Sequence, residues 1–168
     1  MAFAMANERF KVRIANDHLV FCSAHFISFH GHQCERLHGH NYRTSIELEG
    51  ELDRDFYVFD FIALKKWAKA ITDELDHHVL LATQNPVIHL VETTDRVRVN
   101  YEDREWVFPR GDCILLSIEN TTAELLARYI ADRLLESLRE HESFVPAALQ
   151  VEVEENVGQS ATYAWSPS

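Results

Sequence analysis

Cysteine is scarce in this sequence, which has only Cys22, Cys34 and Cys113 among 168 residues. Three widely separated cysteines cannot build a disulfide framework, so we expect each to be a free thiol. Positive charge is also short, with 16 lysines and arginines against 27 aspartates and glutamates. The net charge of -11 repels polyanions and argues against a nucleic-acid partner.

Long apolar runs are missing as well. No stretch approaches the roughly 20 apolar residues that cross a bilayer, and the first residues lack the basic and apolar regions of a signal peptide. These features predict a cytoplasmic protein without membrane contact. No linker, low-complexity tract or repeat divides the chain, so we expect one domain over residues 1–168.

Strand patterns are present at both ends of the chain. From His40 to Leu48 every second residue is apolar or small, which predicts a half-buried strand. Upstream, "KVRI" and "HLVFCSAHFI" predict a strand interrupted at the turn-prone pair Asn16-Asp17. "ALQVEVEEN" and "SATYAW" predict two closing strands.

Two segments switch to helical spacing. The first opens at Asp60, a plausible N-cap, and the second opens where Thr121 and Glu124 have the spacing of a capping box. Between them, an excursion at about 83–112 predicts two or three short strands. This order of elements predicts an α+β fold, an antiparallel sheet with two helices on one face.

Histidines gather in the segment "CERLHGHNYRTSIEL". His38 and His40 are two residues apart, so in a strand both rings leave the face that carries Tyr42. A single histidine on an inward face is usually a partly buried residue whose ring nitrogens are hydrogen-bonded to the backbone. Here a third histidine, His25, follows another apolar strand. Three histidines with an open fourth position form a common catalytic zinc site. His30 and His32 flank a glycine in an expected loop and are weaker candidates.

Cys34 has three interpretations that spacing does not separate. It is an inert small hydrophobe, a fourth ligand that closes a structural zinc site, or a thiolate that moves protons beside the metal. The neighbouring Glu35 is either a solvated loop charge or a second reactive group. The "DHH" stretch, by itself, is typical of a solvated helix end.

Together the motifs "FCSAHF", "CERLHGHNY", "LDHH", "NTTAELLARYIADRL" and "VEEN...SATYAW" resemble, in this order, the 6-pyruvoyltetrahydropterin and 6-carboxytetrahydropterin synthase family. The resemblance runs from about Phe21 to Tyr163. It implies the tunnelling fold (T-fold), in which sheets of several subunits join in an oligomeric barrel, typically a homohexamer made of two trimers. It also implies the substrate 7,8-dihydroneopterin triphosphate and a Zn2+ cofactor.

Residue roles follow from the same resemblance. It implies that the zinc ligands are His25, His38 and His40, that Cys34 is the proton-transferring thiol, and that Asp76 with His77 assists it. It implies that Glu155 anchors the pterin ring and that Thr122 contacts it. Strand alternation is consistent with the role of Glu155. Its odd number places it on the same face as the apolar residues of its strand, so its carboxylate would point inward, although a strand-end bulge would turn it outward.

The reaction stays open among three hypotheses. The short Cys-x3-His-Gly-His spacing favours 6-carboxytetrahydropterin synthase, on a 7-deazaguanine (queuosine-type) pathway. The second hypothesis is 6-pyruvoyltetrahydropterin synthase, which eliminates triphosphate from the same substrate. The third is a non-enzymatic module with a structural zinc. Some relatives also use a glutamate near the position of Glu35 to cleave the substrate side chain.

Overall fold

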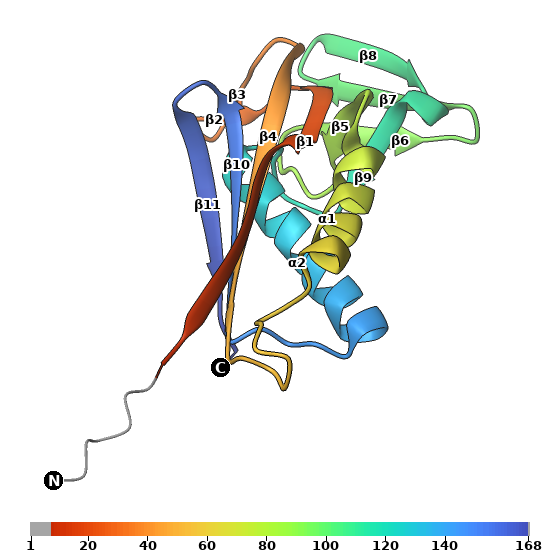
Figure 1. Ribbon diagram of the computed structural model, residues 1–168. Coiled ribbons are helices and arrows are strands. Elements are labelled where there is room, and N and C mark those ends of the chain that lie inside the picture. The colour runs from red at the N-terminus through yellow and green to blue at the C-terminus, as the bar shows by residue number, and fades with distance from the viewer. Residues whose placement is uncertain (1–7, 168) are drawn as a thin grey trace, which may run out of the picture.

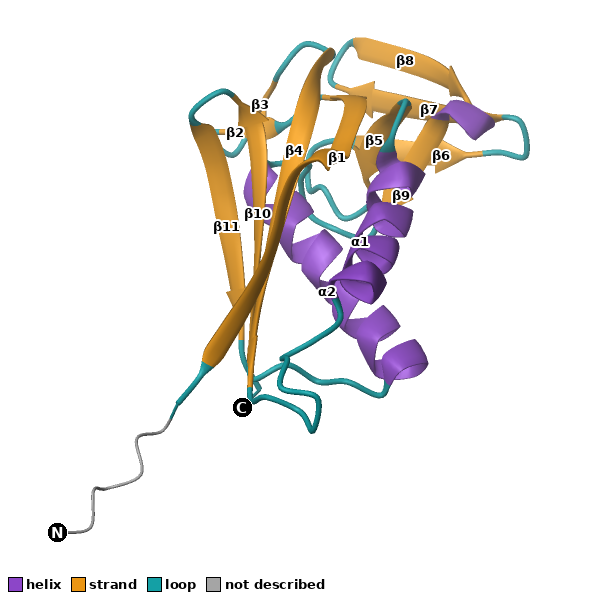
Figure 2. Cartoon of the chain, viewed as in Figure 1, coloured by secondary structure: helices purple, strands orange, loops and turns teal. Residues whose placement is uncertain are grey.

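A six-stranded sheet forms one layer of the molecule, and two helices cover one of its faces (Figures 1 and 2). The computed structural model describes residues 8–167. In spatial order the strands are β11 (Gln159–Trp165), β10 (Ala148–Asn156), β4 (His38–Gly50), β1 (Phe10–His25), β5 (His78–Ala82) and β9 (Cys113–Leu116). The single-domain prediction covers residues 1–168 and stays a prediction. Residues 1–7, the first half of the segment inspected for a signal peptide, lie outside the described residues.

The long antiparallel pair β1–β4 brings the N-terminal strand against the histidine-rich segment. Its register runs from Phe10 opposite Gly50 to His25 opposite His38, with an irregularity between Ala15 and Val20. The predicted interruption at Asn16-Asp17 coincides with this irregularity in the pairing, but the strand itself does not end there. A bulge absorbs the extra residues while the flanking apolar residues stay on the buried face.

Both predicted helices are confirmed. The first, α1 (Phe61–Leu75), begins after Asp60, whose carboxylate accepts the backbone N–H of Ile62 at 2.9 Å. The second, α2 (Ala123–Glu142), has Thr122 as its N-cap and no side-chain capping hydrogen bond. The predicted Thr121–Glu124 capping box is therefore wrong, and the Thr121 hydroxyl instead contacts His25 Nδ1 at 3.2 Å.

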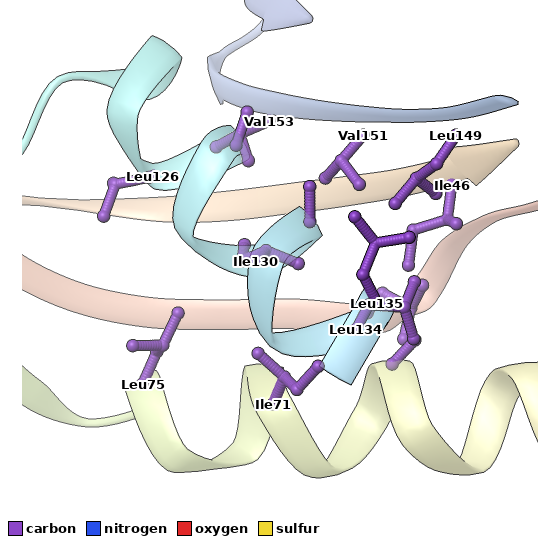
Figure 3. Close-up of a cluster of buried hydrophobic side chains, with 14 of the residues drawn as sticks. Ile46, Ile71, Leu75, Leu126, Ile130, Leu134, Leu135, Leu149, Val151 and Val153 are labelled. Atoms are coloured by element: carbon purple, nitrogen blue, oxygen red, sulfur yellow. The ribbon is translucent and has the colours of Figure 1, made fainter. Parts of the chain in front are cut away.

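The main core lies between the helices and the inner face of the sheet (Figure 3). Helix α2 contributes an apolar stripe of Leu126, Ile130 and Leu134, all fully buried. Facing them, the alternating residues Leu149, Val151 and Val153 of β10 are also fully buried. Burial of each such side chain contributes about 1.5–3 kcal/mol, so this core holds the strands that carry the histidines in a fixed position.

Two strands depart from the antiparallel pattern. Strand β5 pairs in parallel with β1 through Ser23 and Ala24, and β9 pairs in parallel with β5. The predicted α+β fold with helices on one face is confirmed, with these two parallel pairings added to the antiparallel strands. Sequence reasoning missed them because "HVLLA" and "CILL" are short apolar runs without alternation.

The excursion between the helices forms a separate three-stranded sheet of β6 (His89–Glu92), β7 (Arg96–Tyr101) and β8 (Arg104–Pro109), followed by the short helix η1 (Arg110–Asp112). It lies at the same end of the molecule as the small hairpin of β2 (Ser28–Phe29) and β3 (Gln33–Cys34) (Figure 1). A second apolar cluster joins this sheet to β5 and β9, with Cys34 packed at its margin. No helix in residues 8–167 is both long and apolar enough to cross a membrane.

Candidate metal centre and neighbouring thiol

Three histidines meet where β1 ends and β4 begins. His25 is paired with His38 across the two strands, and Ser23 with His40. The ring centroids are 4.7 Å apart for His25–His38, 5.2 Å for His25–His40 and 4.8 Å for His38–His40. The structure thus brings together the three residues that the sequence analysis selected, on the face that carries the buried Tyr42.

The glycine between two of these histidines permits the close approach of the strands. A Cβ at Gly39 would lie 3.2 Å from the carbonyl oxygen of Ser23 on β1. A side chain at this position would push β4 away from β1 at the site. The close pairing of β4 with β1 therefore explains the glycine of the His-Gly-His sequence without reference to any ligand.

Backbone carbonyls orient two of the imidazoles. His25 Nδ1 lies 2.9 Å from the carbonyl of Thr121, and His38 Nδ1 lies 2.8 Å from that of Arg36. Each Nδ1 therefore carries the proton that it donates, and Nε2 is left as the acceptor nitrogen. This arrangement is common in metal-binding histidines, because it fixes both the tautomer and the direction of the ring.

A carboxylate oxygen faces these nitrogens. Glu155 Oε1 lies 3.3 Å from His25 Nε2 and 2.9 Å from His40 Nε2, yet the buried His40 Nε2 has no hydrogen-bond partner of suitable geometry. One ligand atom from each of His25, His38, His40 and Glu155 lies within 4.8 Å of the others. Lone pairs that converge in this way repel one another unless a proton or a metal ion lies between them, and histidine nitrogens with a carboxylate oxygen are ligands that zinc binds, so these residues fit a metal ion.

Burial keeps the innermost histidine neutral. Desolvation first, together with the neighbouring His38 and His40, lowers the pKa of His25 to about 4, against the opposing effect of the Thr121 carbonyl. A neutral imidazole at pH 7 retains the lone pair that a metal needs. The Tyr42 hydroxyl donates to His25 Nε2 at 3.1 Å, and burial first, then Glu155, raises the pKa of Tyr42.

Glu155 also borders an open pocket. The strand register shifts between Glu154 and Asn156, so a bulge occurs there, but the carboxylate stays on the inner face as parity predicted. Its side chain is 29% exposed. The pocket has a volume of about 350 Å³ and is lined by Glu155, Thr122 and the start of β11, among others. The two residues predicted to bind a substrate thus share one pocket beside the histidines.

Cys34 is half-buried at the end of β3. Its thiol donates to the Glu35 carbonyl at 3.4 Å, and two nitrogens of Arg104 contact the backbone around it. Burial raises the pKa of the Cys34 thiol, whereas the charge and hydrogen bonding of Arg104 lower it. The Glu35 carboxylate lies 3.9 Å from His38 Nε2, which brings this residue to the rim of the histidine cluster.

Asp76 and His77 form a pair at the junction of α1 and β5. Asp76 accepts the backbone N–H of Cys22 at 2.7 Å and lies 2.8 Å from His77 Nδ1. The Cys22 hydrogen bond, followed by that of His77, lowers the pKa of Asp76. The His77 side chain is 81% exposed, and within residues 8–167 no hydrogen bond joins the pair to Cys34. The structure does not bring these three predicted residues together in one chain.

Sequence reasoning missed two residues that contact His25. Tyr42 has the strand parity of His38 and His40, a signal that was available, whereas Thr121 contacts His25 from 96 positions away. His30 and His32 lie exposed in the β2–β3 turn, outside the cluster, as expected for weaker candidates.

Comparison with known proteins agrees with this geometry. The family model described as 6-pyruvoyl tetrahydropterin synthase matches residues 15–165. A Methanocaldococcus jannaschii protein named putative 6-carboxy-5,6,7,8-tetrahydropterin synthase is 36% identical over 146 residues, which cover 86% of this chain and 89% of that protein. A Haemophilus influenzae 6-carboxy-5,6,7,8-tetrahydropterin synthase is 30% identical over 119 residues, covering 68% of this chain and 76% of that protein.

Solved structures give the same result. The Plasmodium vivax 6-pyruvoyltetrahydropterin synthase, solved as a variant in which a catalytic glutamate is replaced by alanine, has a TM-score of 0.88 and 31% identity, covering 96% of this chain and 100% of that one. The fold is therefore the predicted tunnelling fold. The chain belongs to the 6-pyruvoyl tetrahydropterin synthase family.

Proposed function

We propose that this protein is a zinc-dependent lyase that converts 7,8-dihydroneopterin triphosphate to 6-carboxy-5,6,7,8-tetrahydropterin. The observation that carries the proposal is the convergence of three histidine nitrogens beside the pocket of Glu155 and Thr122. Relatives named 6-carboxy-5,6,7,8-tetrahydropterin synthase support the choice of product. The free thiols Cys22, Cys34 and Cys113 support a cytoplasmic location.

His25, His38 and His40 hold the zinc ion in this proposal. Zinc supplies Lewis acidity, which makes hydroxyl and neighbouring C–H protons of a bound side chain easier to remove. The Thr121 and Arg36 carbonyls keep the rings of His25 and His38 in the tautomer that would bind the ion through Nε2.

Glu155 and Thr122 bind the pterin. A carboxylate accepts the adjacent N–H donors of the 2-amino group and the ring nitrogen in two charge-assisted hydrogen bonds. Thr122 lines the same pocket, and its hydroxyl makes no capping hydrogen bond with α2. This geometry supports a ring bound next to the histidines, with its side chain directed toward them.

Cys34 moves protons at the substrate side chain, and Asp76 with His77 assists it. Because the pair has no hydrogen bond to Cys34 within the described chain and His77 is largely exposed, we propose that it acts on the thiol of a neighbouring copy. The imidazole of His77 is oriented by Asp76, as an acid-base group requires.

A homohexamer made of two trimers is the assembly that we propose. Strand β5 pairs with β1 only at Ser23 and Ala24, so across the described residues the first half of β1 keeps an open edge, as does β11. Exposed edges of this length are normally covered, and joining β11 of one copy to β1 of the next would extend the sheet into a barrel.

A second candidate function is 6-pyruvoyltetrahydropterin synthase. It is favoured by the high similarity to Plasmodium enzymes of that name, of which one has a catalytic glutamate, and by the position of Glu35 near His38. The third hypothesis, a module with a structural zinc, requires Cys34 to be a metal ligand, and it is less well supported because the group of described residues that could hold a metal ion does not include Cys34.

Incubation of the purified protein with 7,8-dihydroneopterin triphosphate separates these functions. A 6-carboxy pterin with release of acetaldehyde supports the first, a 6-pyruvoyl product the second, and no turnover by fully metallated protein the third. The same assay on Glu35→Gln tests whether Glu35 contributes, because a solvated loop charge would leave product and rate unchanged.

A further inference from the structure

The three-stranded sheet holds the segment that carries Cys34. Arg104, the first residue of β8, donates from Nη2 to the carbonyl of Cys34 at 2.7 Å and from Nη1 to the carbonyl of Glu35 at 3.2 Å. Two nitrogens of one guanidinium therefore hold two successive peptide groups. The contact spans about 70 positions of sequence, and it joins the excursion to the β2–β3 hairpin.

Aromatic rings fix the guanidinium in turn. Its central carbon lies 4.8 Å from the centroid of the Tyr101 ring and 5.1 Å from that of Trp106. Trp106 stacks on Phe26 at 4.8 Å, and Phe26 directly follows the metal-site residue His25. The Tyr101 hydroxyl donates to the carbonyl of His32 in the hairpin. Arg104 thus has a defined position relative to both the thiol and the histidines.

The charges around the thiol have opposite effects. Burial is the largest influence and raises the pKa of Cys34, Arg104 lowers it through charge and hydrogen bonding, and Glu35 raises it. Tyr101 also lies beside the thiol, and as a phenol it is neutral at pH 7; burial, then Glu102, raises its pKa further. Arg104 is therefore the group that favours the reactive thiolate.

We propose that Arg104 is a positioning residue for Cys34, holding its backbone in place and keeping a positive charge beside this residue. This role gives the excursion of residues 83–112 a function in catalysis, since it carries the arginine and its aromatic supports. The inference rests on the proposed catalytic role of Cys34, but its central measurement does not need turnover.

The test compares Arg104→Gln, Arg104→Lys and a control, Arg98→Gln. Arg98 lies on β7 of the same sheet and is paired only with Glu105 at the surface. Each metallated protein is treated with iodoacetamide over a range of pH, and alkylation of Cys34 is followed by peptide mass spectrometry. The exposed Cys22 in the same sample is the reference. The midpoint of the profile reports the thiol pKa, and the plateau at high pH reports access.

We expect Arg104→Gln to move the Cys34 midpoint upward by about one pH unit, a roughly tenfold loss of reactivity at neutral pH. The reason is that the substitution removes the positive charge that stabilises the thiolate. Arg104→Lys keeps the charge, so its Cys34 midpoint stays near that of wild type. The lysine cannot donate to both the Cys34 and the Glu35 carbonyls, so kcat falls while KM is preserved. Arg98→Gln should match wild type in all respects. An unchanged midpoint in folded Arg104→Gln would overturn the proposal.

If Arg104→Gln does not fold, Arg104→Lys decides the question, since a lysine variant with wild-type kcat and an unchanged alkylation plateau also overturns it. Failure of the proposed function has a different signature. In that case wild-type protein does not turn over dihydroneopterin triphosphate, while the midpoint shift between wild type and Arg104→Gln is still measurable.

Discussion

Nδ1 of His25 and the main-chain carbonyl of Thr121 are 2.9 Å apart, and this contact joins the end of the first strand to the residue before the N-cap of the second helix. It makes the metal-site geometry depend on the docking of α2, whose apolar stripe is buried against the sheet. The second helix therefore orients a ligand without contributing one.

The metal assignment predicts one zinc ion per chain. Replacing His25 or His38 with Ala should remove a ligand and lower zinc occupancy well below one equivalent, as measured by elemental analysis after dialysis. His89→Ala is the matched control, because His89 is exposed on β6. Full occupancy in His38→Ala would show that the assignment is wrong.

Acid should destabilise the metal-free protein through His25. The folded protein keeps this residue neutral down to about pH 4, whereas the unfolded chain protonates it near pH 6.5. Protons therefore favour the unfolded state as the pH falls through this window, by about 3 kcal/mol in total. Urea unfolding of chelator-treated protein at pH 7, 5.5 and 4.5 measures the effect. Above pH 6.5 the contribution should be flat, and His25→Gln should lose this part of the pH dependence.

The thiol prediction separates a proton-transferring group from a metal ligand. Cys34→Ala should keep zinc and bound pterin while turnover falls by roughly 10²- to 10⁴-fold, the range for acid-base groups. Cys22→Ala, which removes an exposed thiol, should change neither. Simultaneous loss of zinc and activity in Cys34→Ala would instead indicate a closed structural site.

Adjacent glutamates provide a sharp test of pterin binding. Glu155→Gln should weaken pterin binding by roughly 1.5–3 kcal/mol, the range for a hydrogen bond to a charged group. Glu154→Gln should change it little, because Glu154 points to the other face, where it pairs with Arg43 at 3.4 Å. Titration calorimetry with metallated protein measures both. Equal effects would contradict the inward orientation of Glu155 as the anchor.

Mixing two inactive variants tests the shared active site. If Asp76 and His77 serve the thiol of another copy, Cys34→Ala and His77→Ala should complement each other after co-refolding. Activity should return to about a quarter of wild type, since each site then needs one intact copy of each kind. Light scattering of the same samples checks the assembly. A stable monomer, or no recovery in mixed oligomers, would count against the shared site.

Local sequence signals predicted the parts of the molecule that depend on local physics. Alternation placed His38 and His40 on one face with Tyr42, and the N-cap signal at Asp60 located α1. For Glu155, parity allowed an inward side chain and left a strand-end bulge as the alternative; the bulge is present, and the carboxylate still faces the histidines. These predictions succeeded because strand and helix periodicities decide which side chains face a core.

Long-range contacts were beyond the same reasoning. Nothing in the spacing of Thr121 distinguishes a capping residue from one that contacts His25, because the two roles use the same hydroxyl. The hydrogen bond from Arg104 to the Cys34 carbonyl likewise depends on how the three-stranded sheet packs against the β2–β3 hairpin, which no local pattern encodes. The family resemblance supplied candidate roles, but not these supporting contacts.

The three-stranded sheet of β6, β7 and β8 has no strand pairing with the central sheet within residues 8–167, and it is attached through side chains and the second apolar cluster, which it shares with β5 and β9. Such a unit can open on its own, with a lower free energy than global unfolding. The histidines belong to the large cooperative core, whereas the Cys34 segment is held by this smaller unit. Metal retention and catalytic competence therefore have different thermal limits, and on gentle heating the protein should pass through a metal-loaded, inactive state before it unfolds.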